Sequence, residues 1–123
     1  MRRDLRLRRA ADFAHLRSVG KTIRGTFFTL AYTPNGLPHN RYGVITGKRI
    51  GGAVIRNRVK RRLREALRLL DDHLVVGYDV VLIARSEMRS TSFSALEMSL
   101  LLLVGKAGLR RESSNQPVQE NTP

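Results

Sequence analysis

The chain of 123 residues contains no cysteine and no tryptophan, and aromatic residues make up only 6% of it. Without cysteine, disulfides and Cys-ligated zinc are excluded, which fits a reducing cytosol, so we expect a cytoplasmic protein. The three histidines, His15, His39 and His73, are scattered without metal-ligand spacing, and no metal site is predicted on the protein. The longest apolar run, residues 100–104, is too short to cross a bilayer, and the charged N-terminus lacks an apolar signal segment.

Acidic residues are scarce in the first part of the chain. Positions 1–68 carry 18 Arg or Lys against three acids, the remaining positions carry five against seven, and the net charge is +13. Arg outnumbers Lys by 19 to 4, and its planar guanidinium group suits bidentate phosphate contacts and base stacking. The charge therefore favours nucleic acid as the partner, although a membrane surface or a need for solubility would also account for a basic chain.

Six segments have the periodicity of a helix or a strand, in the order α-β-β-α-β-α. They are residues 9–19, 22–33, 41–48, 53–72, 78–84 and 93–106. Gly25 is expected to divide the first strand region into two pieces, and Thr91 or Ser92 to cap the last helix. We expect strand 41–48 to form a hairpin with the strand before it. The almost continuous apolar run at 78–84 is typical of a central strand covered on both faces.

These elements predict one α+β domain over residues 1–108. The expected architecture is an α-β sandwich, in which helices pack on a sheet of three or four strands. Strand 41–48, the Arg-rich helix and strand 78–84 form a βαβ crossover. Residues 109–123 are polar and poor in hydrophobic side chains, so we expect a disordered tail there.

The segment AVIRNRVKRRLREALR, residues 53–68, holds six Arg and one Lys and still keeps an apolar stripe. At 100° per residue, the apolar side chains of this helix fall within about 120° of one another. They are Ile55, Val59, Leu63, Ala66, Leu67 and Leu70. The opposite side and its flanks, which we call the cationic face, comprise Asn57, Arg58, Lys60, Arg61, Arg64 and Arg68. Arg62 falls near the apolar edge and is expected to be partly structural.

The positive side chains of the cationic face repel one another, because each pair of like charges three or four positions apart costs a few tenths of a kcal/mol. Only Glu65, Asp71 and Asp72 offer opposite charge nearby. A solvated helix face is the alternative interpretation, but such faces usually mix charges of both signs. The cationic face is therefore predicted to bind a polyanion.

Two glycines, Gly51 and Gly52, precede the Arg-rich helix, and Lys48 and Arg49 come directly before them. Backbone N–H groups and the positive end of the helix dipole would favour a phosphate at this point. The two glycines are equally consistent with a tight strand-to-helix turn that holds no ligand. The spacings of a P-loop and of a dinucleotide-binding motif are absent.

No group of side chains predicts catalysis by the protein. A Ser-His-Asp grouping is not evident and the carboxylates do not pair at an evident site, so a stand-alone nuclease is disfavoured and no catalytic residue is predicted. A DNA-binding regulator is disfavoured as well, because a strand and two glycines, and no helix, lie directly before the Arg-rich helix. A ribosomal-type structural RNA-binding protein remains an alternative.

The segment GKRIGGAVIRNRVKRRLRE, residues 47–65, resembles the region around the RNR motif of bacterial ribonuclease P protein subunits. The opening RLRRAADFAHLRSVG, the pair Arg41 and Gly43, and the strand YDVVLIAR are similar to further parts of the family pattern. The resemblance covers about residues 4–106.

The resemblance implies a compact α+β domain with a left-handed βαβ crossover and a role in 5′ maturation of precursor tRNA. In that family the catalytic RNA subunit performs the hydrolysis with bound Mg²⁺, so the protein would bind no metal through its side chains alone. Its partners would be this RNA and precursor tRNA, with no membrane involved. The residues expected to bind RNA are Lys48, Arg49, Arg56, Asn57, Arg58, Lys60, Arg61, Arg64 and Arg68.

The resemblance also implies a cleft between the first helix and the sheet that binds the single-stranded 5′ leader. Phe13 matches a family aromatic and would stack on leader bases. Two further family aromatics fall where this chain has Arg17 and Ala31. We assign Arg17 and Phe27 to the cleft, with Phe27 as a replacement ring, and an apolar sheet residue outside the cleft is an equally consistent interpretation of Phe27. Phe27 would then share a face of its strand with Ala31, while Phe28, Leu30 and Tyr32 face the core.

Overall fold

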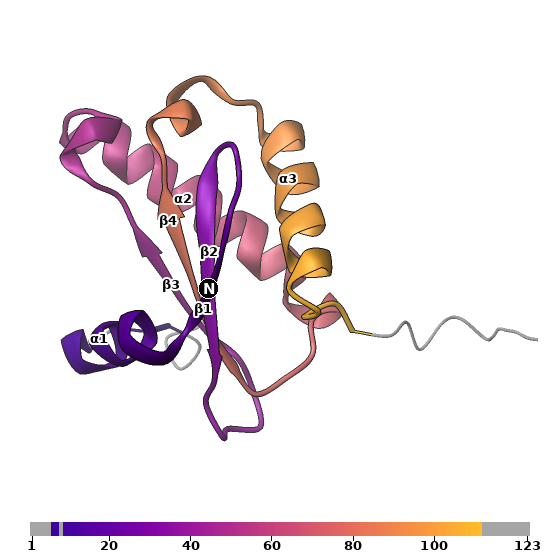
Figure 1. Cartoon of the computed structure of the whole chain (residues 1–123). Coiled ribbons are helices and arrows are strands. Elements are labelled where there is room, and N and C mark those ends of the chain that lie inside the picture. The colour runs from indigo at the N-terminus through magenta and orange to yellow at the C-terminus, as the bar shows by residue number, and fades with distance from the viewer. Residues whose placement is uncertain (1–5, 8, 112–123) are drawn as a thin grey trace, which may run out of the picture.

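The computed structural model describes residues 6–7 and 9–111, which form three helices and a four-stranded mixed sheet (Figure 1). The elements follow in the order α1 (Ala10–Val19), β1 (Lys21–Arg24), β2 (Phe28–Pro34), β3 (Arg41–Ile45), α2 (Ala53–Leu70), β4 (Tyr78–Ala84) and α3 (Phe93–Lys106). Short 3-10 turns lie at Lys48–Ile50, Asp71–His73 and Ser86–Ser90. The predicted α+β class and the predicted division of the first strand region at Gly25 are confirmed.

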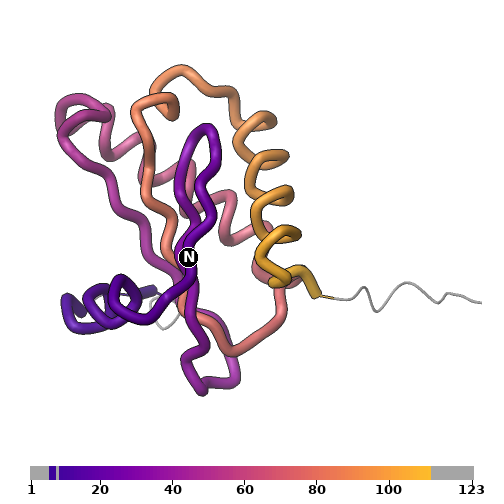
Figure 2. Tube along the Cα trace, viewed as in Figure 1, coloured from indigo at the N-terminus to yellow at the C-terminus, as the bar shows by residue number. Residues whose placement is uncertain are grey.

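The sheet order is β1-β2-β4-β3, which corrects one prediction (Figure 2). We expected β3 to form a hairpin with β2, but β4 lies between them, antiparallel to β2 and parallel to β3. Tyr32 and Tyr42 are therefore both opposite Val80, one on each side of it. The reason is burial: β4 is the most apolar strand, and the central position covers it on both edges and both faces.

Alternate side chains of β4 enter two cores on opposite faces of the sheet. Val80 and Leu82 belong to the larger core, which α2 and α3 complete. Val81 belongs to the smaller core, where it meets Leu7 and the α1 side chain Leu16. Helices α2 and α3 thus cover one face, and α1 packs on the other (Figure 1).

The predicted last helix is confirmed in its bounds and its cap. Helix α3 runs from Phe93 to Lys106, and the Ser92 hydroxyl accepts a hydrogen bond of 3.1 Å from the Ala95 N–H. Its buried residues, Leu96, Leu100, Leu103 and Val104, lie at helical spacing. None of the helices in the described part of the chain is long and apolar enough to cross a membrane.

The prediction that Phe27 shares a sheet face with Ala31 is wrong. Strand β2 begins only at Phe28, so the strand alternation does not extend back to Phe27. Phe27 lies in the turn between β1 and β2, and its ring packs against the larger core, whereas Ala31 belongs to the smaller one. Its carbonyl accepts a hydrogen bond of 2.9 Å from the Arg85 N–H, which fixes the turn against the end of β4.

The domain extends beyond the predicted boundary at residue 108. Leu109 is buried in the larger core, and its carbonyl accepts a hydrogen bond of 2.8 Å from the Val75 N–H. The Arg111 N–H donates to the His73 carbonyl at 2.8 Å. The expectation of a disordered tail from residue 109 is therefore wrong for residues 109–111, and residues 112–123 lie outside the described residues.

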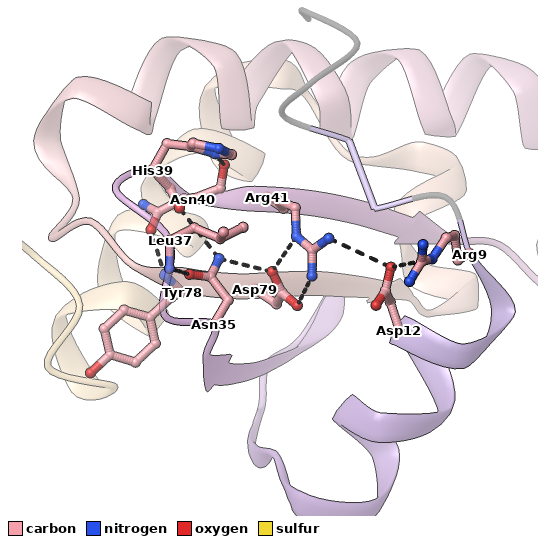
Figure 3. Close-up of polar contacts among 9 residues, drawn as sticks. All are labelled: Arg9, Asp12, Asn35, Leu37, His39, Asn40, Arg41, Tyr78 and Asp79. Carbon is pink, nitrogen blue, oxygen red and sulfur yellow. Dashed lines mark hydrogen bonds and ion pairs between the residues drawn. The ribbon is translucent and has the colours of Figure 1, made fainter.

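A buried carboxylate ties four parts of the fold together (Figure 3). Asp79 of β4 is only 4% exposed and accepts two hydrogen bonds from the Arg41 guanidinium of β3, at 2.9 and 2.8 Å. The Asn35 amide in the β2–β3 connection donates to the same carboxylate at 3.0 Å. Arg41 also lies 3.6 Å from Asp12 on α1. The hydrogen bond to Asp79 raises the pKa of Arg41 above its ordinary value. Through its contacts with Asp79 and Asp12, Arg41 joins the strands to α1.

Replacing Asp79 by Asn should lower the free energy of unfolding by about 2–3 kcal/mol, because Arg41 then loses its charged partner. This is less than the cost for a fully buried pair, since Arg41 keeps some contact with water. Urea denaturation checks the prediction. As the control, Asp12→Asn removes two longer ion pairs, at 3.6 Å to Arg41 and 3.8 Å to the exposed Arg9, and should cost less than about 1 kcal/mol. An equal cost for both variants would contradict the central role of Asp79.

Candidate nucleic-acid interface

Helix α2 buries the apolar stripe that the sequence predicts. Val59, Leu63, Ala66, Leu67 and Leu70 are buried in the larger core, and Ile55 is half-buried against it. Burying each Val or Leu side chain contributes about 1.5–3 kcal/mol. The stripe therefore fixes which side of α2 faces the solvent.

The cationic face of α2 points away from the core as predicted. Asn57, Arg58, Arg61 and Arg68 are exposed, and Lys60 and Arg64 are half-buried. Arg56 does not join this face, because one residue after Ile55 it falls at the angle of the apolar stripe. Its side chain is half-buried, and its Nε is buried with no hydrogen-bond partner among the described residues.

Little of the charge on the cationic face is neutralised within the protein. Arg68 donates two hydrogen bonds to Glu65, at 3.0 and 2.6 Å, and this contact lowers the pKa of the Glu65 carboxyl. In the described part of the chain, no carboxylate lies within ion-pair distance of Arg58, Lys60, Arg61 or Arg64. Arg62, predicted to be partly structural, donates a hydrogen bond of 2.5 Å to the Thr91 carbonyl.

The N-terminal segment adds a cation that sequence analysis missed. The Leu7 N–H donates to the Tyr42 carbonyl at 2.7 Å, so the segment runs beside the β3 edge of the sheet. This pairing places Arg6 near Arg64 of α2. The pKa of Arg64 is lowered from its ordinary value, first by partial burial and then by repulsion from Arg6. The positive surface thus continues from α2 onto Arg6.

The start of α2 has no side-chain cap, and Gly52 occupies the capping position. Lys48 and Arg49 are exposed in the 3-10 turn directly before it. Gly51 has a φ of +145°, and a Cβ there would lie 3.0 Å from the Ile55 side chain, so the turn itself requires this glycine. Nothing lies within 4 Å of a Cβ at Gly52, so the space beside this helix end is open and nothing there requires a glycine.

Phe13 of α1 packs closely on the face of the sheet that α1 covers. A Cβ on Gly43 of β3 would lie 2.8 Å from two atoms of the Phe13 ring, so only glycine lets the ring approach this strand. The ring packs against the smaller core, as Ile45 and Ile83 also do. Arg17 is exposed one turn further along α1. The structure thus places Phe13 and Arg17 at this face, and Phe27 at the other.

A family model named Ribonuclease P matches residues 1–108 of the chain. The chain belongs to the ribonuclease P protein family. The ribonuclease P protein component of Caldanaerobacter subterraneus is 42% identical over 107 residues, which are 87% of this chain and 92% of that relative. The protein component of Chloroflexus aggregans is 41% identical over 124 residues, which are 100% and 92% of the two chains.

Two solved structures of ribonuclease P proteins share the fold. The protein from Staphylococcus aureus superposes with a TM-score of 0.78 at 26% identity, covering 85% of this chain and 96% of that one. The protein from Thermotoga maritima gives 0.76 at 28% identity, covering 82% and 96%. The family function is tRNA processing by a ribonucleoprotein endoribonuclease.

The double substitution Arg61→Ala with Arg64→Ala should weaken binding of ribonuclease P RNA by the protein. It should also flatten the dependence of log K on log salt by about one unit per lost phosphate contact, because fewer counterions are released. Filter binding over a range of salt concentrations measures both effects. Arg110→Ala with Arg111→Ala, which removes the same charge outside the cationic face, is the control. Equal slopes for the two double variants would show that the cationic face does not contact RNA.

Proposed function

We propose that this protein binds the catalytic RNA subunit of ribonuclease P through the cationic face of α2 and the neighbouring Lys48 and Arg49. In this role it assists removal of the 5′ leader from precursor tRNA. The observation that carries the proposal is a row of exposed cations on a helix whose other side is buried, with few carboxylates to neutralise it. Such a row presents guanidinium groups at fixed spacing to a phosphate backbone.

We assign the hydrolysis to the RNA subunit and its Mg²⁺, with the protein as a binding component. Several carboxylates of the described domain have structural partners: Asp79 binds Arg41, Glu65 binds Arg68, and Asp71 accepts a hydrogen bond from the buried Tyr42 hydroxyl. Within residues 6–7 and 9–111, no three His, Cys, Asp or Glu gather where they could hold a metal ion. We therefore propose no magnesium ligand on the protein itself.

The 5′ leader is proposed to bind at the sheet face beside α1. The Phe13 ring, held against Gly43, offers a surface on which an unpaired base can stack. Arg17 stands where the family has a second aromatic, and its exposed guanidinium group can contact a leader phosphate or stack on a base. Phe27 is left out of this site because it packs in the other core.

Reconstitution tests the proposed function as a whole. Purified protein, a bacterial ribonuclease P RNA and a precursor tRNA with a 5′ leader are mixed at low Mg²⁺, and cleavage is followed by gel electrophoresis. The protein should strongly stimulate cleavage by the RNA and should cleave nothing alone, because it raises substrate affinity and supplies no catalytic group. Cleavage by the protein alone would favour a nuclease, and the absence of stimulation would favour a structural RNA-binding protein.

The leader site is tested separately by Phe13→Leu, which keeps apolar volume in the smaller core and removes the flat ring. The reconstituted holoenzyme should bind precursor tRNA more weakly by about 1–3 kcal/mol, the range for one stacked base. Binding of mature tRNA, which has no leader, should not change. Phe27→Leu is the matched control, since the same substitution then falls in the other core. An equal loss for both tRNAs would place Phe13 outside the leader site.

A further inference from the structure

A depression lies between α2 and the start of α3, beside the cationic face. It is lined by Arg58, Arg61, Arg62, Glu65 and Phe93, and most of its exposed lining is apolar. Its volume of about 390 Å³ lies near the lower end of the roughly 300–1,000 Å³ of small-ligand sites. Phe93 is half-buried, with part of its ring packed on the larger core and part left accessible. An aromatic surface is therefore present within a group of arginines.

The two helices that line this depression are joined by a hydrogen bond near its Phe93 side. Arg62 donates its hydrogen bond of 2.5 Å from α2 to the Thr91 carbonyl, two residues before Phe93. The Ser92 hydroxyl caps α3 at the next position. Phe93 is the first residue of that helix, so its backbone is held beside α2 before any ligand binds, and its side chain packs partly on the larger core. A pre-organised ring loses little entropy when a flat ligand stacks on it.

The charge around the ring favours an anionic ligand. Arg58 and Arg61 have no carboxylate within ion-pair distance in the part of the chain that the structure describes. The single acid of the depression, Glu65, is engaged by Arg68 through two hydrogen bonds. A nucleotide combines a flat base, which can stack, with a phosphate. This combination matches one ring flanked by two guanidinium groups without a carboxylate partner among the described residues.

We propose that Phe93, Arg58 and Arg61 form a binding site for one unpaired nucleotide of the RNA that lies on the cationic face. The base stacks on the Phe93 ring, and the two guanidinium groups contact the phosphates on either side of it. The inference rests on the proposed function, because it takes the RNA on α2 as the source of the nucleotide. It further requires that the RNA segment facing this depression be single-stranded or bulged, since a paired base cannot reach the ring.

A tryptophan reporter tests the stacking directly. The chain contains no tryptophan, so Phe93→Trp gives a protein with a single indole in the depression. Titration with ribonuclease P RNA should quench its fluorescence, because a base stacked on the indole quenches emission. Tyr78→Trp, at the start of β4 and outside the depression, is the matched reporter and should change little. If both variants bind RNA equally well and their emission changes alike, the stacking site is overturned.

Affinity measurements provide a second test that separates this inference from the proposed function. Phe93→Leu keeps the packing on the core and should weaken RNA binding about tenfold, whereas Phe93→Tyr keeps a ring and should bind like the parent. Thermal unfolding of each variant confirms that it is folded. If Phe93→Leu binds RNA normally while the Arg61 and Arg64 double variant does not, the stacking site is overturned and the proposed function stands. If the Phe93→Leu variant and the Arg61 and Arg64 double variant both bind RNA normally, the proposed function and the stacking site are overturned together.

Discussion

The attachment of α2 to the sheet by one apolar stripe is the constraint on which the rest of the structure depends. Arginines at helical spacing repel one another by a few tenths of a kcal/mol per pair, while each buried Val or Leu of the stripe contributes about 1.5–3 kcal/mol. Burial therefore outweighs the repulsion, and α2 stays helical with its cations in solvent. The cationic face is ready for a polyanion because the protein neutralises little of its charge.

The central strand β4 gives that helix its platform. Its side chains enter both cores, and its neighbours β2 and β3 are held to it along both edges. Asp79 at its start binds Arg41 and Asn35, and through Arg41 the network reaches α1. One strand therefore sets the position of α2 on one face of the sheet and of Phe13 on the other. The two proposed RNA contacts, with the catalytic subunit and with the leader, therefore both depend on β4.

Local patterns predicted much of the fold and of the candidate site. The stripe and the cationic face of α2, the role of Arg62, the strand at residues 78–84 and the Ser92 cap all follow from spacing within one segment. Two of the failures involve contacts between distant segments. Strand order depends on which strand gains most from a central position, and Leu109 is ordered because it reaches residues 73–75 across the sequence. The prediction that Phe27 shares a sheet face with Ala31 failed because it extended the strand alternation of β2 into the preceding turn.

The sequence by itself determined that a helix carries a dense positive face on an apolar back, because helical periodicity places those side chains without reference to the rest of the chain. Only the tertiary structure decided what lies beside that face. Arg6 reaches Arg64 through the pairing of the N-terminal segment with β3, and Phe93 reaches Arg58 and Arg61 through the packing of α3 on α2. Both neighbours come from far along the chain, and such proximity is set by packing, which no local pattern encodes.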